Sequence, residues 1–250
     1  MQNSKKIYFL SDAHLGVPSH EKSLVREKLL IKWLDEASKD AEEIYLMGDL
    51  FDYWFEYKTV VPRGFVRILG KLAELTDRGL PINLFTGNHD MWMFDYLPSE
   101  IGVKIYREPI TRVFNGKKFY LGHGDGLGPG DTGYKILKKV FNNKICQWMM
   151  ARLHPNLGVG LGNYWSRKSR ASTGNTDKEY LGNDKEWLAI YAKEILKTEH
   201  FDYFIFGHRH LPINIKIAKN STYINLGDWL NYFTYAVFDG EKLELKEYLK

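Results

Sequence analysis

Two polar side chains directly follow the first apolar run of the chain, and their types and spacing could do chemistry. Residues 7–10 have the length and composition of a buried strand, and Asp12 and His14 come just after them. Side chains at positions i and i+2 of an extended chain point to the same side. The carboxylate and the imidazole are therefore expected to converge on one point just beyond the end of the strand.

Four further apolar runs end in the same way, with a glycine and then oxygen or nitrogen donors. They are EIYLMG before Asp49, INLFTG before Asn88, KFYLG before His123, and YFIFG before His208 and His210. Ligands bind at the carboxyl ends of strands in α/β sheets. Five of the eight histidines lie at these strand ends, which predicts one shared site.

Asp, His and Asn side chains together are typical ligands of divalent Mn²⁺, Fe²⁺ or Zn²⁺. Such donors are too many for one catalytic ion with an open position, and they suit two ions that share a carboxylate. Asp49 stands alone after its strand and is the natural bridge. A single GD or GH pair usually marks only a turn, but the whole ordered set indicates a metal site. The predicted ligands are Asp12, His14, Asp49, Asn88, His123, His208 and His210.

The elements that must position these residues follow from apolar periodicity. Three strand-like runs, KKIYFLS, EIYLMGD and INLFTGN, alternate with helical patterns over about 21–37 and 62–80, which predicts a parallel sheet. In the second half, Asn115-Gly116 and Asp239-Gly240 signal type I′ hairpins, and YFIF and STYINLG also read as strands of a second sheet. Residues of about 126–197 are mostly helical in pattern. We interpret them as an insertion within a single domain of residues 1–250.

The composition of the chain limits which classes of function are expected. The chain has 250 residues, 44% of them hydrophobic, and a formal charge of +4. This mild basicity suits an anionic substrate or a membrane surface, and no nucleic-acid partner is expected. One cysteine, Cys146, excludes an internal disulfide and a cysteine-based zinc site. The N-terminal residues lack a signal-peptide pattern and no run is long enough to span a membrane. We expect a cytoplasmic protein, with peripheral contact to the inner face of the membrane as an open alternative.

The ordered motifs DxH, GD, GNHD, GH and GHxH, from Asp12 to His210, resemble those of the calcineurin-like metallophosphoesterases. The resemblance implies an αββα fold, in which two packed mixed β-sheets are flanked by helices, and two divalent ions, expected to be Mn²⁺, with Fe²⁺ or Zn²⁺ also fitting. It implies that His89 faces the phosphate, that Asp90 orients His89, and that Asp52 of GDLFD has a supporting role. The implied ligands are Asp12, His14 and His210 for one ion, Asn88, His123 and His208 for the other, and Asp49 as the bridge.

Within this family the sequence is similar to the UDP-2,3-diacylglucosamine diphosphatases of lipid A synthesis. The similarity rests on the compact length, the stretch HGDGLGPGDTGY, and a helical insertion before GHxH. It implies a nucleotide-linked glycolipid substrate, whose diphosphate is cleaved to a lipid monosaccharide phosphate and UMP. The well-studied members have arginine where this chain has His89. A soluble phosphodiester, a dinucleoside polyphosphate or a phosphoprotein therefore remains an alternative substrate, and a metal-free interaction scaffold a third hypothesis.

The insertion could contribute substrate contacts. In KILKKVFNNKICQWMMARLH, apolar residues at helical spacing lie among lysines and arginines. This pattern indicates either an amphipathic helix pair packed on the core or an acyl-chain chamber with a basic rim. GVGLGN at 158–163 follows a helical stretch rather than a strand, so it is not read as a nucleotide loop. The predicted substrate contacts are Asp125, Arg167, Lys168, Arg170, Trp148 and Met149.

Overall fold

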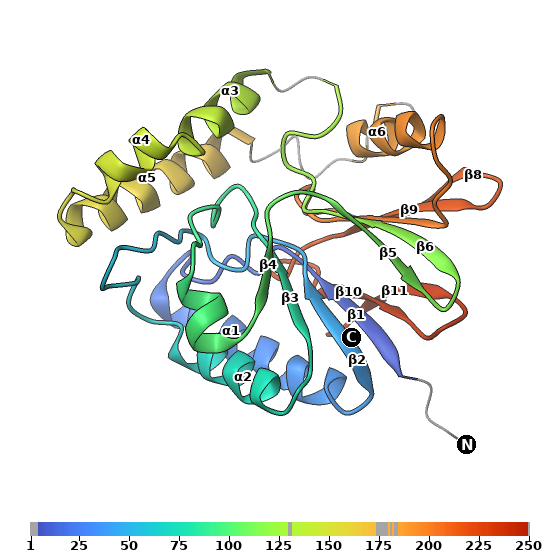
Figure 1. Ribbon diagram of the computed structural model, residues 1–250, viewed down its shortest axis with the longest axis horizontal. Coiled ribbons are helices and arrows are strands. Elements are labelled where there is room, and N and C mark those ends of the chain that lie inside the picture. The colour runs from blue at the N-terminus through green and yellow to red at the C-terminus, as the bar shows by residue number, and fades with distance from the viewer. Residues whose placement is uncertain (1–4, 130–131, 174–179, 181, 183–184, 250) are drawn as a thin grey trace.

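Two β-sheets pack face to face, and helices cover their outer sides (Figure 1). This computed structural model describes residues 5–129, 132–173, 180, 182 and 185–249, and the predicted insertion extends in part beyond these residues. The architecture confirms the predicted αββα sandwich.

The first sheet has six strands in the order β11-β10-β1-β2-β3-β4. Strands β1 to β4 are mutually parallel, as the alternation of strand and helix patterns predicted, and β10 pairs antiparallel with β1. The strands are β1 (Lys6–Leu10), β2 (Ala41–Leu46), β3 (Ile82–Phe85), β4 (Lys104–Tyr106), β10 (Thr234–Phe238) and β11 (Leu243–Glu247).

Side chains alternate between the two sides of a strand, so the first sheet packs against the second sheet on one side and against helices on the other. Along β1, Ile7 and Phe9 face the second sheet, whereas Tyr8 and Leu10 pack under the helices. Successive side chains point to opposite sides of the strand. Because both sides of this central strand are covered, both of its faces are apolar. The outer layer consists of α1 (His20–Ala37) and α2 (Val66–Asp77), with one turn of π-helix, η1 (Leu97–Ile101), beside them.

The second sheet has five strands in the order β5-β6-β7-β9-β8. Strands β6, β7 and β9 are parallel to one another, so their carboxyl ends meet at one edge. Phe204 and Phe206 point outward from β7 and pack under the helix α6 (Trp187–Leu196). The strands are β5 (Ile110–Phe114), β6 (Lys117–Leu121), β7 (Tyr203–Phe206), β8 (Pro212–Ala218) and β9 (Ser221–Leu226).

The region predicted as one helical insertion divides into two parts. Helices α3 (Thr132–Phe141), α4 (Lys144–Met150) and α5 (Pro155–Thr173) lie together over the loops at the carboxyl ends of the strands (Figure 1). Helix α6 instead belongs to the outer layer of the second sheet, where Leu188 and Ala192 are fully buried. We call α3, α4 and α5 the lid. None of the described helices is both long and apolar enough to cross a membrane.

The two predicted hairpins differ from each other. Asn115 and Gly116 have φ of 45° and 76°, which confirms the type I′ turn between β5 and β6. The second prediction is corrected, because four residues separate the paired Phe238 and Leu243, and of Asp239 and Gly240 only the glycine has positive φ. This hairpin also lies in the first sheet rather than the second. The Asp239 side chain explains the longer loop by accepting two backbone N–H groups.

Candidate metal centre

The two parallel strand sets bring their carboxyl ends to one place, and most of the predicted ligands meet there. Asp12, His14 and His210 form one group whose donor atoms lie within 4.8 Å of one another, and Asp12, Asp49 and His123 form a second. The Nε2 atoms of His14 and His210 are 3.3 Å apart. Two imidazole nitrogens this close, with carboxylates around them, are arranged as ligands around a common point.

Asp49 belongs to the second group and also faces His14 of the first. Its Oδ2 atom is 3.6 Å from Nε2 of His14 and 3.4 Å from Nε2 of His123. The His123 nitrogen is also 3.4 Å from Oδ1 of Asn88. The ring of His208 lies 5.3 Å from that of His123, centroid to centroid. One carboxylate oxygen thus faces both donor groups, which is the arrangement that a bridging ligand requires.

Backbone N–H groups fix the orientation of the Asp49 and Asp12 carboxylates. Asp49 Oδ1 accepts the N–H of His89 at 2.9 Å, and Asp12 Oδ2 accepts the N–H of His208 at 3.0 Å. The other oxygen of each side chain, Asp49 Oδ2 and Asp12 Oδ1, is buried and has no hydrogen-bond partner among the described residues. Burying an unpaired charged oxygen is costly. Divalent cations are the partners that these oxygens and imidazoles fit.

Three imidazoles are oriented through their second nitrogen. Nδ1 of His123 is 2.8 Å from the carbonyl of Met47, and Nδ1 of His14 is 3.3 Å from Asp52 Oδ1. Nδ1 of His210 is 3.3 Å from Asp228 Oδ2. A proton held on Nδ1 by an oxygen leaves the lone pair of Nε2 free for a metal.

Backbone strain is concentrated in the same place. Five of the predicted ligands, Asp12, His14, Asp49, His208 and His210, have φ between 41° and 68°. This left-handed conformation costs about 1–3 kcal/mol for such residues and persists where the surroundings impose it. Gly207 and Gly87 permit the crowding, because a Cβ on them would collide with the carboxylates of Asp12 and Asp49.

The charges of the cluster shift one another's pKa values. Burial alone would raise the pKa of Asp49, but the positive charge of His123 brings it well below its usual range. Burial disfavours the charged form of His123, yet the carboxylate of Asp49 raises its pKa to about 10. Burial and the charge of His123 lower the pKa of His208 to about 4. Without cations, the cluster is therefore held together by a protonated His123 beside ionised carboxylates.

The two predicted catalytic residues have different surroundings. His89 is near the cluster, and its Nδ1 is 3.1 Å from the carbonyl of Asp52 and 3.0 Å from Oγ of Ser166. Asp90 accepts the N–H groups of Gly87 and Phe51. The prediction that Asp90 orients His89 is therefore corrected: Asp90 ties two loops together, and Asp52 and Ser166 hold the imidazole. Burial beside Asp49 raises the pKa of Asp90 to about 7.

The predicted substrate contacts are dispersed. Asp125 is buried and paired within the protein, by Lys138 at 2.7 Å and by the hydroxyl of Tyr134 at 2.6 Å, so it anchors the start of the lid. Arg170 reaches the metal cluster, where it pairs with Asp52. The remaining four lie on exposed surfaces of the lid: Arg167, Lys168, Trp148 and Met149. The side chains of Trp148 and Met149 are 58% and 52% exposed.

Asp228 is a functional candidate that the sequence reasoning missed. It follows Gly227 at the end of β9, so the run INLGD carries the same signal of strand, glycine and donor as the predicted ligands. Besides facing His210, its carboxylate accepts the N–H groups of Leu230, Asn231 and Tyr232. The structure therefore places Asp228 behind a ligand rather than among the ligands.

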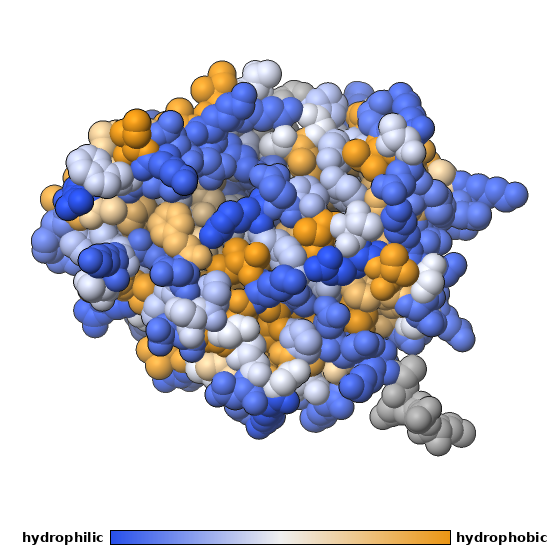
Figure 2. Space-filling model, viewed as in Figure 1, coloured by the Kyte–Doolittle hydropathy of each residue, from blue (hydrophilic) through white to orange (hydrophobic). Residues whose placement is uncertain are grey.

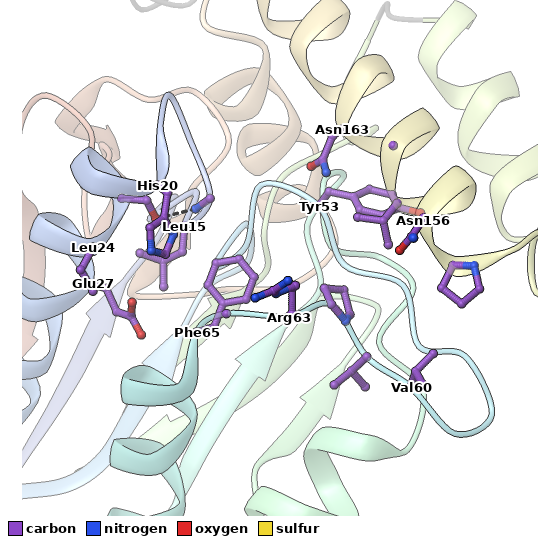
Figure 3. A pocket seen from close by; sticks show the side chains of 18 of the residues that line it. Leu15, His20, Leu24, Glu27, Tyr53, Val60, Arg63, Phe65, Asn156 and Asn163 are labelled. Carbon is purple, nitrogen blue, oxygen red and sulfur yellow. Dashed lines mark hydrogen bonds between the residues drawn. The ribbon is translucent and has the colours of Figure 1, made fainter.

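A cavity of about 790 Å³ lies between α5, α1 and the loop over residues 60–65 (Figure 3). It begins at Leu15, the residue after His14, and extends past Phe65 and Tyr53. Most of its wall is apolar or aromatic, with polar groups such as Arg63 and Asn163 among them. Its size is that of a small-molecule site, and two of its lining residues, Leu15 and Tyr53, directly follow His14 and Asp52 in the chain.

Comparison with protein families assigns the chain to a known class. The model of the family described as calcineurin-like phosphoesterase matches residues 5–212, which is most of the chain. The chain belongs to the calcineurin-like phosphoesterase family. Together with the cluster of carboxylates and imidazoles, this membership defines a metal-dependent hydrolase.

Two relatives support the assignment along nearly the whole chain. UDP-2,3-diacylglucosamine hydrolase of Porphyromonas gingivalis (strain ATCC BAA-308 / W83) is 42% identical, covering 96% of this chain and 97% of the relative. The protein of the same name from Histophilus somni (strain 129Pt) is 26% identical, over 90% and 92% of the two chains. Among solved structures, the phosphoesterase Yfce of E. coli aligns with a TM-score of 0.47 at 15% identity, over 95% of this chain and 90% of that one.

Proposed function

We propose that the protein hydrolyses the diphosphate of UDP-2,3-diacylglucosamine and releases a lipid monosaccharide phosphate and UMP. The observation that carries this proposal is the apolar cavity beside a buried cluster of metal-binding donors. The largely apolar wall of this cavity suits acyl chains, which a soluble substrate lacks. The 42% identity to a UDP-2,3-diacylglucosamine hydrolase over nearly the whole chain supports the same substrate.

We assign the cations to the two donor groups that share Asp49. Asp12, His14 and His210 would hold one ion, and Asn88, His123 and His208 the other. When bound, divalent cations act as Lewis acids on phosphate oxygens and make a water more acidic. The mixed oxygen and nitrogen donors suit Mn²⁺, and Fe²⁺ or Zn²⁺ would fit the same donor types.

His89 is the residue of this chain that we propose to act on the phosphate. Its Nδ1 faces two oxygens, the carbonyl of Asp52 and Oγ of Ser166, and the Ser166 proton is directed at the Asp52 carboxylate. Nδ1 therefore carries a proton, and Nε2 is the atom that gains or loses one. Burial lowers the pKa of His89 to about 4, so an arriving phosphate anion must raise that pKa before Nε2 can donate to it.

We propose that the cavity holds the acyl chains. Leu15, Val61, Phe65 and Val159 give it apolar walls on both the core and the lid side. Its start next to His14 would bring the glycosyl phosphate close to the metal cluster while the chains stay out of water. Burying each methylene of a chain there is worth about 0.8 kcal/mol.

We also propose that the outer face of the lid touches the membrane surface. Ten of the seventeen large apolar side chains exposed in the described part of the chain lie on the lid, among them Ile145, Trp148 and Leu157. Exposed Lys139 and Lys144 lie between them, and Figure 2 shows apolar and strongly hydrophilic residues side by side over α3 and α4, at the upper left. Apolar side chains flanked by lysines are typical of helices that lie on anionic lipid.

The test is hydrolysis of UDP-2,3-diacylglucosamine and of bis-nitrophenyl phosphate by the purified protein, with and without Mn²⁺. We expect Mn²⁺-dependent release of UMP, and a fall to the background rate in Asp49→Ala. Asp77→Ala, which removes an exposed carboxylate at the end of α2, serves as the control and should leave the rate unchanged. Turnover of the generic diester without any release of UMP would replace the proposal with a soluble substrate.

A further inference from the structure

One buried carboxylate outside the predicted ligand set connects the lid to the metal cluster. Asp52 is 2% exposed, and it lies three residues after Asp49 in the loop that follows β2. Asp52 Oδ1 and the Nδ1 atom of His14 are both buried and have no hydrogen-bond partner of good geometry in the described chain. They face each other at 3.3 Å. Asp52 is thus placed to set the orientation of a metal ligand.

The lid reaches the same carboxylate through α5. Ser166 donates from Oγ to Asp52 Oδ2 at 2.6 Å, and the guanidinium of Arg170 pairs with Asp52 Oδ1. Ser166 and Arg170 are four residues apart, so they lie on one face of the helix. Both oxygens of Asp52 are therefore used by α5, and Oδ1 is shared between α5 and His14.

His89 belongs to the same network. Its Nδ1 lies within hydrogen-bond distance of the main-chain carbonyl of Asp52 and of Oγ of Ser166, and the ring centroids of His14 and His89 are 4.8 Å apart. A shift of α5 would therefore disturb Asp52, His14 and His89 together. Such a shift is not absorbed by soft packing, because a Cβ on Gly162 of α5 would collide with the ring of Tyr53, the neighbour of Asp52.

We propose that Asp52 is a positioning residue that couples docking of the lid helix α5 to cation binding. With α5 in place, Ser166 and Arg170 hold the carboxylate against Nδ1 of His14, so that Nε2 is directed toward the cluster. With α5 displaced, the carboxylate loses two partners and His14 loses its orientation. Coupling of two binding events is reciprocal, so cations must stabilise the docked helix by the same factor by which the docked helix strengthens cation binding.

The inference rests on the proposed cation sites and is independent of the substrate. It is tested by Mn²⁺ titration calorimetry and by hydrogen exchange of the peptides that cover α5. Mn²⁺ should slow exchange in α5 by about 5-fold or more, which is the usual lower range of such coupling. Ser166→Ala and Arg170→Gln should weaken Mn²⁺ binding by about 10-fold, the loss typical for removed supporting contacts of a ligand.

The matched control is Lys168→Gln, which removes a positive charge from an exposed position of the same helix. It should bind Mn²⁺ as the unaltered protein does. Asp52→Asn should abolish the effect of Mn²⁺ on exchange in α5, and Ser166→Ala gives the same information if Asp52→Asn does not fold. Unchanged exchange in α5 upon Mn²⁺ binding, or wild-type Mn²⁺ affinity in both helix variants, would overturn the coupling. A complete lack of Mn²⁺ binding would instead overturn the cation sites themselves.

Discussion

At the scale of single residues, the metal centre depends on which atom of each side chain faces inward. Backbone N–H groups take one oxygen of Asp12 and one of Asp49, and acceptors take Nδ1 of His123 and of His210. The remaining oxygen or Nε2 atom points to the cluster. Five predicted ligands have a left-handed backbone conformation. This agrees with the inward orientation of their donor atoms, since such strain is retained where a site requires it.

Cation binding should release a proton from His123. Its pKa of about 10 in the cation-free protein means that it is charged at neutral pH, whereas a ligating imidazole must be neutral. Affinity for Mn²⁺ should therefore rise as the pH rises toward 10 and fall at lower pH. Asp12 and Asp49, whose pKa values are lowered, are already ionised and release nothing.

Calorimetry in two buffers of different protonation enthalpy measures this proton directly. The heat of Mn²⁺ binding should differ between the buffers by the heat of at least one buffer proton, because the pKa of the ligand His14 is raised as well. His123→Asn, which keeps an oxygen ligand without a titrating group, should lose most of that difference. Equal heats in both buffers for the unaltered protein would refute the protonated state of His123.

At the scale of elements, α5 is the helix that brings the lid to the core. The glycines of α5 differ in the space around them. Gly158 faces Tyr57 and Gly162 faces Tyr53, with no room for a Cβ at either position. Gly160 faces open space. The same helix carries Ser166 and Arg170 to Asp52. The run GVGLG therefore serves close packing of a helix, in agreement with the prediction that it is not a nucleotide loop.

Alanine at these glycines should have opposite effects on stability. Gly162→Ala should lower the free energy of unfolding by about 1–3 kcal/mol, because the new methyl group overpacks the ring of Tyr53. Gly160→Ala should raise it by about 0.5–1 kcal/mol, because alanine favours the helix and meets nothing. Urea denaturation followed by tryptophan fluorescence compares the two, and equal effects would show that α5 does not pack on Tyr53 as described.

At the scale of the whole molecule, the parallel strands of both sheets have their carboxyl ends at one edge of the sandwich. The lid lies over that edge (Figure 1). The cavity lies between part of α5 and the core, and apolar side chains of the lid such as Ile145 and Trp148 are exposed. On the proposed function, a substrate with long acyl chains would enter from a membrane that the lid would contact. Catalysis and lipid extraction would then use opposite sides of the lid.

Binding to vesicles tests this orientation. The protein should sediment with phosphatidylcholine vesicles that contain phosphatidylglycerol, and less so at high salt, because Lys139 and Lys144 contribute through charge. Ile145→Ser and Trp148→Ser should weaken sedimentation. Val66→Ser, which changes an exposed apolar side chain of α2 outside the lid, should not. Equal sedimentation of all three variants would place the contact elsewhere.

Sequence patterns that reflect local geometry predicted the first half of the fold well. Strand and helix alternate as the periodicity indicates, and the Asn115-Gly116 turn follows from backbone preferences alone. The hairpin of β10 and β11 was predicted but assigned to the wrong sheet. Its partner β1 lies more than 220 residues away in the sequence, and apolar alternation does not specify which sheet a strand joins.

The sequence by itself determined that donor residues gather at one place, because parallel strands end at a common edge and each donor follows its own strand. It did not reveal that Asp52 joins Ser166 and Arg170, which are more than 110 residues away, or that α6 belongs to the second sheet. Those relations depend on how an amphipathic helix docks, and a helical pattern states which face is apolar but not what that face will cover. Only the tertiary structure decided that the lid and the metal centre share a carboxylate.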